Sequence, residues 1–229
     1  MDLRLRADKV AATAERLQRR IAERFPGSSL SEVAAAAHGI AEQARERSAS
    51  LRRLNWPLRL LGALLAAASV GLLLYAGSSL RATRPETFQG FIELLEPALG
   101  SAVFIGAFLL FVWSLEIRWK RRRALAALHE LRSLAHVVDM HQLTKDPERS
   151  RGAGPDTESS PKRELTPFLL GRYLDYCGEL LALLSKVAAL YAQAFEDDVA
   201  LTAVDQIEGL TTGLQRKIWQ KIMLLDRAG

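Results

Sequence analysis

The chain has 229 residues, of which 49% are hydrophobic, 25% charged and 7% aromatic, with 31 basic against 26 acidic side chains. This composition is typical of a folded protein and argues against wholesale disorder. The single cysteine excludes an intramolecular disulfide framework and any metal site built from several cysteines.

The first 55 residues are predicted to form a cytoplasmic helical hairpin (1–55) that turns at Pro26-Gly27. Apolar residues recur at alternating spacings of three and four along both arms, which is typical of a heptad seam. The seam residues are Leu3, Ala7, Val10, Ala14, Leu17 and Ile21, then Leu30, Val33, Ala37, Ile40, Ala44, Arg47, Leu51 and Leu54. Ser29 with Glu32 fits a capping box at the start of the second arm. Packing on other helices of the same chain and an intermolecular zipper would both produce these seams.

Two apolar runs without a charge follow, 21 residues from Leu60 to Leu80 and 19 residues from Pro97 to Leu115. At about 1.5 Å rise per residue, each helix could cross a hydrocarbon core of roughly 30 Å. A buried core helix is the alternative for such a run, but two runs with aromatic ends favour membrane spans. We therefore predict an all-α membrane protein with a two-span transmembrane helical hairpin (56–119), a short external turn (81–96) and a cytoplasmic helical bundle.

Basic residues gather on the outer flanks of the two spans. They are Arg45, Arg47, Arg52, Arg53 and Arg59 before the first span, and Arg118, Lys120, Arg121, Arg122 and Arg123 after the second. Because an excess of Lys and Arg marks the cytoplasmic side, both termini are expected in the cytoplasm of a bacterial inner membrane or plasma membrane. The second basic group, with Trp56, Trp113 and Trp119, is predicted to lie at the interface and attract anionic lipid. Its place beside a span favours lipid over nucleic acid, so no nucleic-acid partner is expected.

Small residues at a spacing of four predict close helix packing in the second span, at Ala98, Ala102 and Gly106. The same spacing also arises by chance in sequence rich in Ala and Gly. Neither span has an ionisable residue near its middle, which argues against a proton-driven motor or a secondary transporter.

The second span has no helix stop at its end, so a cytoplasmic stalk helix (120–145) is expected to continue it. A flexible linker (146–166) should follow, because Thr144 to Pro167 contains four prolines and two glycines and no apolar periodicity. The rest of the chain is predicted to be a C-terminal helical hairpin (167–229).

Thr166 with Pro167 fits a cap and first turn for the first helix of this C-terminal hairpin. A broad apolar face follows at Leu169, Leu170, Tyr173, Leu174, Cys177, Leu180, Leu181, Leu184, Val187, Ala188, Tyr191 and Phe195. A face this wide must pack against something. The acidic cluster Glu196-Asp197-Asp198 is expected to start the last helix. Its predicted seam is Val204, Ile207, Leu210, Leu214, Ile218, Met223 and Leu225.

Few residues of the sequence suggest catalytic or metal-binding chemistry. His129, Arg132, His136 and Asp139 share one face of the stalk, where a polar stripe is favoured over a metal site because a closed site would need further ligands. Cys177 lies within an apolar helix, which predicts an inert thiol. The sequence contains no phosphate-binding loop, nucleophile elbow or HExxH motif. We therefore predict no enzyme activity, no catalytic or metal-binding residue and no cofactor.

Two functions fit these features. The first is a membrane-anchored interaction or scaffold protein that forms a homo-oligomer or docks a helical protein partner in the cytoplasm, because the face at residues 169–195 lacks an assigned partner. The alternative is a small oligomeric ion channel or membrane-permeabilising effector built from the two-span hairpin. Neither span shows the polar stripe that would line an open pore.

Overall fold

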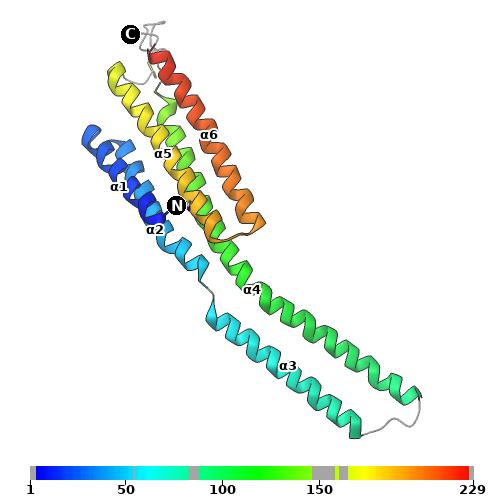
Figure 1. Cartoon of the computed structure of the whole chain (residues 1–229). Helices are drawn as coiled ribbons and strands as arrows, with labels where there is room; N and C mark the ends of the chain where they lie inside the picture. Colours follow the sequence, from blue (N-terminus) through cyan, green and yellow to red (C-terminus); the bar gives the residue numbers. More distant parts are fainter. Residues whose placement is uncertain (1–3, 54, 83–87, 146–157, 160–164, 227–229) are drawn as a thin grey trace. The chain divides into compact units, whose positions relative to one another are not determined.

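The computed structural model describes residues 4–53, 55–82, 88–145, 158–159 and 165–226. The described residues form six α-helices and no strand, which confirms the predicted all-α class (Figure 1). The helices are α1 (Ala7–Arg24), α2 (Ser29–Arg52), α3 (Trp56–Ala82), α4 (Phe88–Leu143), α5 (Pro167–Ala194) and α6 (Asp198–Asp226).

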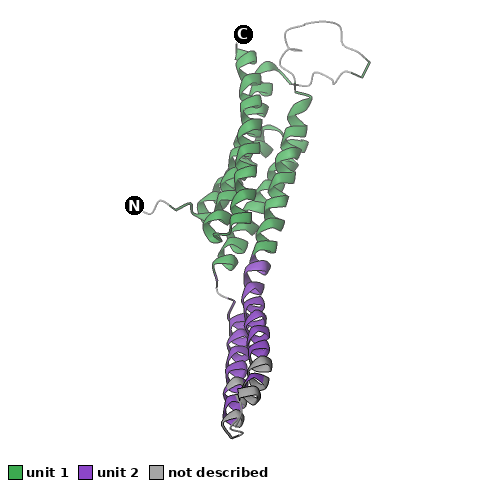
Figure 2. Cartoon of the chain, turned by 90° about the vertical axis from the view of Figure 1, so that its right-hand side faces the viewer, with its two compact units in different colours: residues 1–52, 121–229 green, residues 53–120 purple. Residues whose placement is uncertain are grey.

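The chain divides into two compact units (Figure 2). The bundle unit comprises Met1–Arg52 and Arg121–Gly229, and the hairpin unit comprises Arg53–Lys120. The helix α4 contributes residues to both units.

In the bundle unit, α5 is the helix most fully enclosed. It packs against α1, α2 and α6. The broad apolar face expected from the sequence is buried except at its two ends, where Leu169 and Phe195 pack on the core but are partly exposed. Tyr176, Leu183 and Leu190 on a further side of the helix are buried as well. Each fully buried leucine stabilises the fold by about 1.5–3 kcal/mol relative to an exposed one. The face at residues 169–195 is therefore covered by other helices of the same chain. It does not support a docking role.

The bundle-unit part of α4 completes this core. Its buried hydrophobic residues are Ala124, Ala127, Leu128, Leu131, Leu134, Ala135 and Val138, which belong to the same cluster as the buried residues of α1, α2, α5 and α6. This part of α4 therefore packs inside the bundle.

Most residues of the seams of α1 and α2 are also buried inside the chain, while Ala7, Ile40 and Arg47 are partly exposed. In α1, Val10, Ala14, Leu17 and Ile21 are all buried, while Leu3 lies outside the described residues. The two helices pack on each other and on α5. They are joined at Gly27, whose φ of 64° lies in the left-handed region that glycine adopts without strain. The intrachain alternative accounts for both seams.

The first turn of α2 corrects the predicted capping box. Ser28, not Ser29, is the cap, because its Oγ accepts a hydrogen bond from the backbone N–H of Ser31 at 3.2 Å. Ser29 Oγ lies instead 3.2 Å from His141 Nδ1. At α5 the prediction is confirmed, since Thr166 Oγ1 accepts a hydrogen bond from the backbone N–H of Leu169 at 3.3 Å.

The seam of α6 differs from the prediction near its end. Val204, Ile207, Leu214, Ile218 and Leu225 are buried as expected. Met223 is 39% exposed, and Ile222 packs on the core in its place. The prediction was wrong there because it stepped five residues from Ile218, which is 500° around a helix and leaves the core-facing side.

Two ion pairs join helices at the surface of the bundle unit. Arg20 of α1 donates two hydrogen bonds to Glu179 of α5, at 2.7 and 3.1 Å. Arg47 of α2 donates to Glu130 of α4 at 2.8 Å. The side chains of both pairs are 35% to 47% exposed, so each pair contributes at most about 1 kcal/mol and the buried apolar residues stabilise the bundle.

In the hairpin unit, the described helices extend into the range predicted as an external turn. The helix α3 continues to Ala82 and α4 already begins at Phe88, while residues 83–87 lie outside the described residues. The linker predicted at 146–166 is described only at residues 158–159 and 165–166.

Candidate membrane-anchoring hairpin

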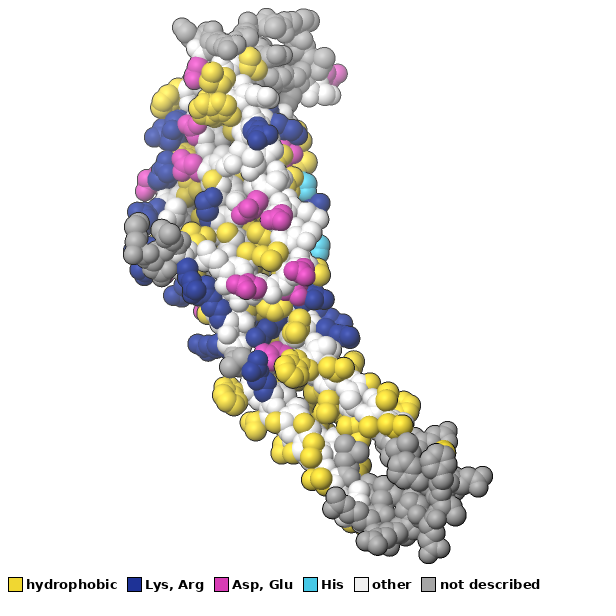
Figure 3. Space-filling view, turned by 45° about the vertical axis from the view of Figure 1, so that its right-hand side comes forward, with side chains coloured by type: hydrophobic (Ala, Val, Ile, Leu, Met, Phe, Trp, Pro, Cys, Tyr) yellow, Lys and Arg dark blue, Asp and Glu magenta, His cyan; other side chains and the backbone are white. Residues whose placement is uncertain are grey.

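The surface of the hairpin unit is dominated by exposed apolar side chains. Leu64, Leu74 and Phe104 are 65%, 69% and 79% exposed. Figure 3 shows hydrophobic side chains covering the described part of the hairpin, whereas charged side chains are spread over the bundle. Water-soluble proteins rarely expose contiguous apolar patches of this kind.

Two helical stretches of the described chain are long and apolar enough to cross a membrane. One ends at Leu72 and the other begins at Leu99, and 0% and 6% of their most apolar windows are buried. By length and composition, these stretches suggest membrane association.

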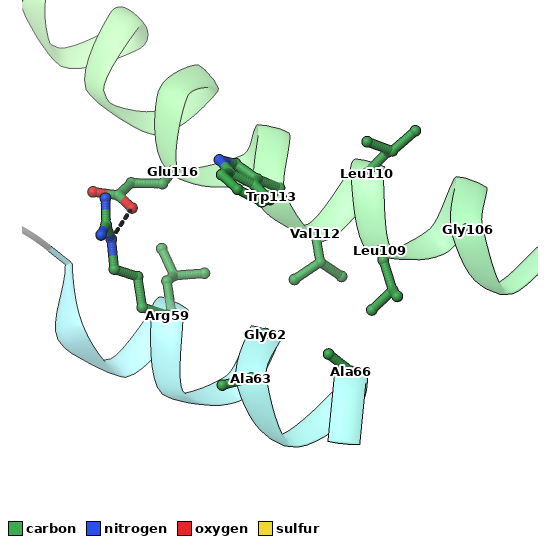
Figure 4. A pocket seen from close by; sticks show the side chains of 11 residues that line it. Arg59, Gly62, Ala63, Ala66, Gly106, Leu109, Leu110, Val112, Trp113 and Glu116 are labelled. Atoms are coloured by element: carbon green, nitrogen blue, oxygen red, sulfur yellow. Dashed lines mark hydrogen bonds and ion pairs between the residues drawn. The ribbon is translucent and has the colours of Figure 1, made fainter. Parts of the chain in front are cut away.

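A crevice of about 640 Å³ lies between α3 and α4 within the hairpin unit (Figure 4). Gly62, Ala63 and Ala66 of α3 line one side, and Val112 points toward them from α4. A Cβ atom at Gly62 would lie 3.6 Å from Val112 Cγ1, which is ordinary van der Waals contact, so α3 and α4 lie close enough here for a methyl group to touch the facing side chain.

One end of this crevice carries a charge cluster around Glu116. Its carboxylate accepts hydrogen bonds from Arg59 Nε at 3.2 Å and from the backbone N–H of Asn55 at 3.3 Å. Lys120 Nζ lies 2.9 Å from the same carboxylate, and the side chains of Glu116 and Lys120 are 14% and 11% exposed. Two cations therefore share one carboxylate, which leaves one net positive charge at this end.

The predicted basic group is divided between different partners. Lys120 pairs with Glu116, and the Arg118 guanidinium lies 5.6 Å from the centroid of the Phe111 ring. Arg121 belongs to the bundle unit, where it donates hydrogen bonds to Asp197 at 2.7 to 3.0 Å. The remaining members, Arg122 and Arg123, are exposed.

Arg121 and Asp197 anchor the start of α6. The Asp197 side chain is 6% exposed and also accepts a hydrogen bond from the backbone N–H of Ala200 at 3.2 Å. The guanidinium beside it holds the pKa of Asp197 below its ordinary value. The acidic cluster expected to start α6 thus contributes a cap through Asp197.

The predicted interface tryptophans are all exposed: Trp56 by 68%, Trp113 by 78% and Trp119 by 42%. Of the predicted packing residues, Gly106 lines the crevice, while Ala102 is exposed. The side chain of Ala98 lies outside the described residues.

Residues considered for metal or thiol chemistry lie apart or are buried. His129 and His136 are exposed on α4, and Asp139 accepts a hydrogen bond from Gln142 Nε2 at 2.6 Å. Within the described part of the chain, no group of three or more His, Cys, Asp or Glu side chains could hold a metal ion. Cys177 is fully buried, and burial raises the pKa of its thiol to about 12.

Sequence reasoning missed the role of Glu116 as the centre of a cluster. Its spacing of four residues from Lys120 was a usable signal, because such pairs meet on one helix face. The contribution of Arg59 and Asn55 could not be found that way, since it depends on how α3 lies against α4.

Comparisons with protein-family models, with curated proteins and with solved structures give no match to this chain.

Proposed function

We propose that the chain is a membrane-anchored helical interaction protein. Its hairpin unit crosses the bilayer twice, and its bundle unit meets a helical protein partner or a second copy in the cytoplasm. The observation that carries the proposal is the contrast between the two units. The bundle unit buries its apolar faces within the chain, whereas the hairpin unit leaves large apolar side chains such as Leu74 and Phe104 exposed.

Covering this exposed apolar surface with lipid would be energetically favourable. Moving one large apolar side chain out of water is worth about 1.5–3 kcal/mol, and the hairpin unit exposes many of them. The polar groups of a helical backbone are already hydrogen-bonded internally, so two helices are a permissible spanning structure. The charge cluster at Glu116 lies at one end of the apolar crevice, where it could reach the interface.

Alkaline carbonate extraction of membranes from cells that express the full chain tests the anchoring. We expect the protein to stay in the membrane pellet, as an integral protein does. Release into the supernatant, in the manner of a peripheral protein, would contradict the proposal.

Thiol labelling tests the orientation in the same cells. In a Cys177→Ser background, Arg84→Cys should react with an impermeant maleimide from outside. Gln220→Cys, at an exposed position of α6, should react only after permeabilisation. Labelling of the Gln220→Cys variant in intact cells would place the C-terminus outside and reject the orientation.

Support for docking by the bundle unit comes from α6. Trp219 is 62% exposed, and Met223, one helical turn further on, is 39% exposed. Exposed tryptophan is enriched at the centres of protein interfaces. We expect the Trp219→Ser/Met223→Ser double variant to lose oligomers or co-purifying protein when its mass is measured in detergent. The control Phe168→Ser removes a side chain that is 66% exposed on α5 and should retain them. Equal masses and equal co-purification for both variants would reject this surface.

We do not propose a channel as a second function. Apart from Arg59 and Glu116, which pair with each other, the residues that line the described crevice are apolar or glycine.

A further inference from the structure

A second cavity, of about 330 Å³, lies within the bundle unit where α1 passes into α2 and where α4 ends. Ser29 lines it from the start of α2, and Tyr173 lines it from α5. The last turn of α4 adds His141, and Lys145 follows just after that helix. Within the part of the chain that the structure describes, none of the residues that line the cavity is acidic. The described lining is therefore rich in hydrogen-bond donors and includes the cation of Lys145.

The Ser29–His141 pair always keeps a hydrogen to donate. Their atoms Oγ and Nδ1 lie 3.2 Å apart, so one hydrogen is used between them. A neutral imidazole has one N–H and serine has one O–H, so one of these two hydrogens stays outside their contact in either tautomer.

Lys145 supplies the positive charge. Its Nζ lies 5.4 Å from the centroid of the Tyr173 ring, which places the ammonium beside the cavity. The backbone that carries it is held by Lys221 of α6, whose Nζ donates to the carbonyl oxygens of Gln142 at 2.8 Å and Lys145 at 3.3 Å. The end of α4 is thus fixed from a neighbouring helix.

Tyr173 adds a further hydroxyl from a buried position. It is 5% exposed and lines the same cavity as Ser29. Burial raises the pKa of Tyr173 to about 12, so the hydroxyl keeps its proton at neutral pH. Phe25 and Met140 form an apolar wall to the same cavity.

We propose that this cavity binds a phosphate monoester whose organic part is small and apolar or aromatic. A phosphate group offers three strong acceptor oxygens, which suit the ammonium group of Lys145 and the hydrogens that Ser29, His141 and Tyr173 do not use among themselves. A carboxylate offers only two oxygens. The ester's organic part would lie against Phe25 and Met140, and a volume of about 330 Å³ admits only a small one. The inference is independent of membrane anchoring, because every residue involved belongs to the bundle unit.

Calorimetric titration of the full chain in detergent with phenyl phosphate tests the proposal. We expect saturable binding of one equivalent, at least about fivefold tighter than binding of inorganic phosphate, because the ring adds apolar contact. Phenol, which lacks the charge, should bind more weakly still. Absence of saturable binding, or equal affinity for phenyl phosphate and either of the other two probes, would overturn the proposal.

Variants assign the binding to this cavity. Lys145→Gln removes the cation and should weaken phenyl phosphate binding by about tenfold or more. Ser29→Ala should weaken it by a smaller factor. The matched control Lys186→Gln removes an exposed lysine of α5 and should leave the affinity unchanged. Thermal melts of all three variants check that they fold. Equal affinities for Lys145→Gln and Lys186→Gln, with both folded, would show that the probe binds elsewhere and would reject the site.

Discussion

At the scale of single residues, the contact between Arg121 and Asp197 carries the clearest energetic consequence. Asp197 is nearly buried, and within the described part of the chain Arg121 is the cation that pairs with it. Arg121→Ala should lower the free energy of unfolding by about 1–2 kcal/mol, because it leaves a desolvated carboxylate without its partner. The neighbouring control Arg122→Ala, at an exposed position, should change it by less than about 0.5 kcal/mol. Chemical denaturation of the full chain in detergent measures both, and equal losses would contradict the assignment.

The same pair predicts a dependence on pH. Arg121 lowers the pKa of Asp197 below its ordinary value of 3.8. A carboxyl whose pKa is lower in the folded state stabilises the fold fully above its unfolded pKa, and this stability is lost as pH falls through the folded pKa. The difference in unfolding free energy between the native chain and Arg121→Ala should therefore be full at pH 6 and shrink below about pH 4. A difference that stays constant down to pH 2 would show that the carboxylate charge is not involved.

At the scale of one helix, the first turn of α2 separates two neighbouring serines. Ser28→Ala removes the cap of Ser31 and should cost about 1 kcal/mol of unfolding free energy. Ser29→Ala should lower the unfolding free energy by only about a few tenths of a kcal/mol, since the Ser29 hydroxyl contacts His141 and not the first turn. Denaturation curves of the two variants show which of the two serines caps α2. A larger cost for Ser29→Ala would restore the capping box expected from the sequence.

Helix positions could be predicted because periodicity and capping are local signals. The turn at Pro26-Gly27, the start of α5 at Pro167 and the end of α4 at Leu143 all follow from residues within one or two turns. The error at Ser29 is a shift of one residue that a pattern of spacings cannot resolve, because either of two adjacent serines satisfies it. The error at Met223 could have been avoided, because a step of four residues from Ile218 leads to Ile222.

Contacts between helices could not be predicted in the same way. The wide apolar face of α5 correctly indicated a buried helix, but its partners α1, α2 and α6 come from distant parts of the sequence. The cavity beside Tyr173 combines Ser29 with His141, which are 112 residues apart. Single residues such as His141 carried no signal along the chain, and their meaning depends on three-dimensional neighbours.

At the scale of the whole molecule, an added charge should lower recovery in the membrane when it is placed in the hairpin unit. The same charge in the bundle unit should leave that recovery unchanged. Val70 is 54% exposed near the middle of α3, and Val137 is 40% exposed on the bundle part of α4. If α3 spans a bilayer, Val70→Arg should oppose its insertion by about 2.5–3.5 kcal/mol and lower the fraction recovered in the membrane. Val137→Arg faces water and should leave that fraction unchanged. Quantitative immunoblots of membrane and soluble fractions compare the two, and equal recovery would contradict a spanning α3.

The single cysteine of this chain can report how often the helical bundle opens. Cys177 is sealed in the centre of the bundle, so a maleimide can reach it only when the helices around it separate. In the unmodified protein, the labelling rate of Cys177 should therefore be the rate of a free peptide thiol multiplied by the equilibrium constant for opening. For a stable bundle, this makes labelling slower by about a thousandfold or more. Timed alkylation of the full chain would then follow the unfolding of the bundle without an introduced label site or a denaturant.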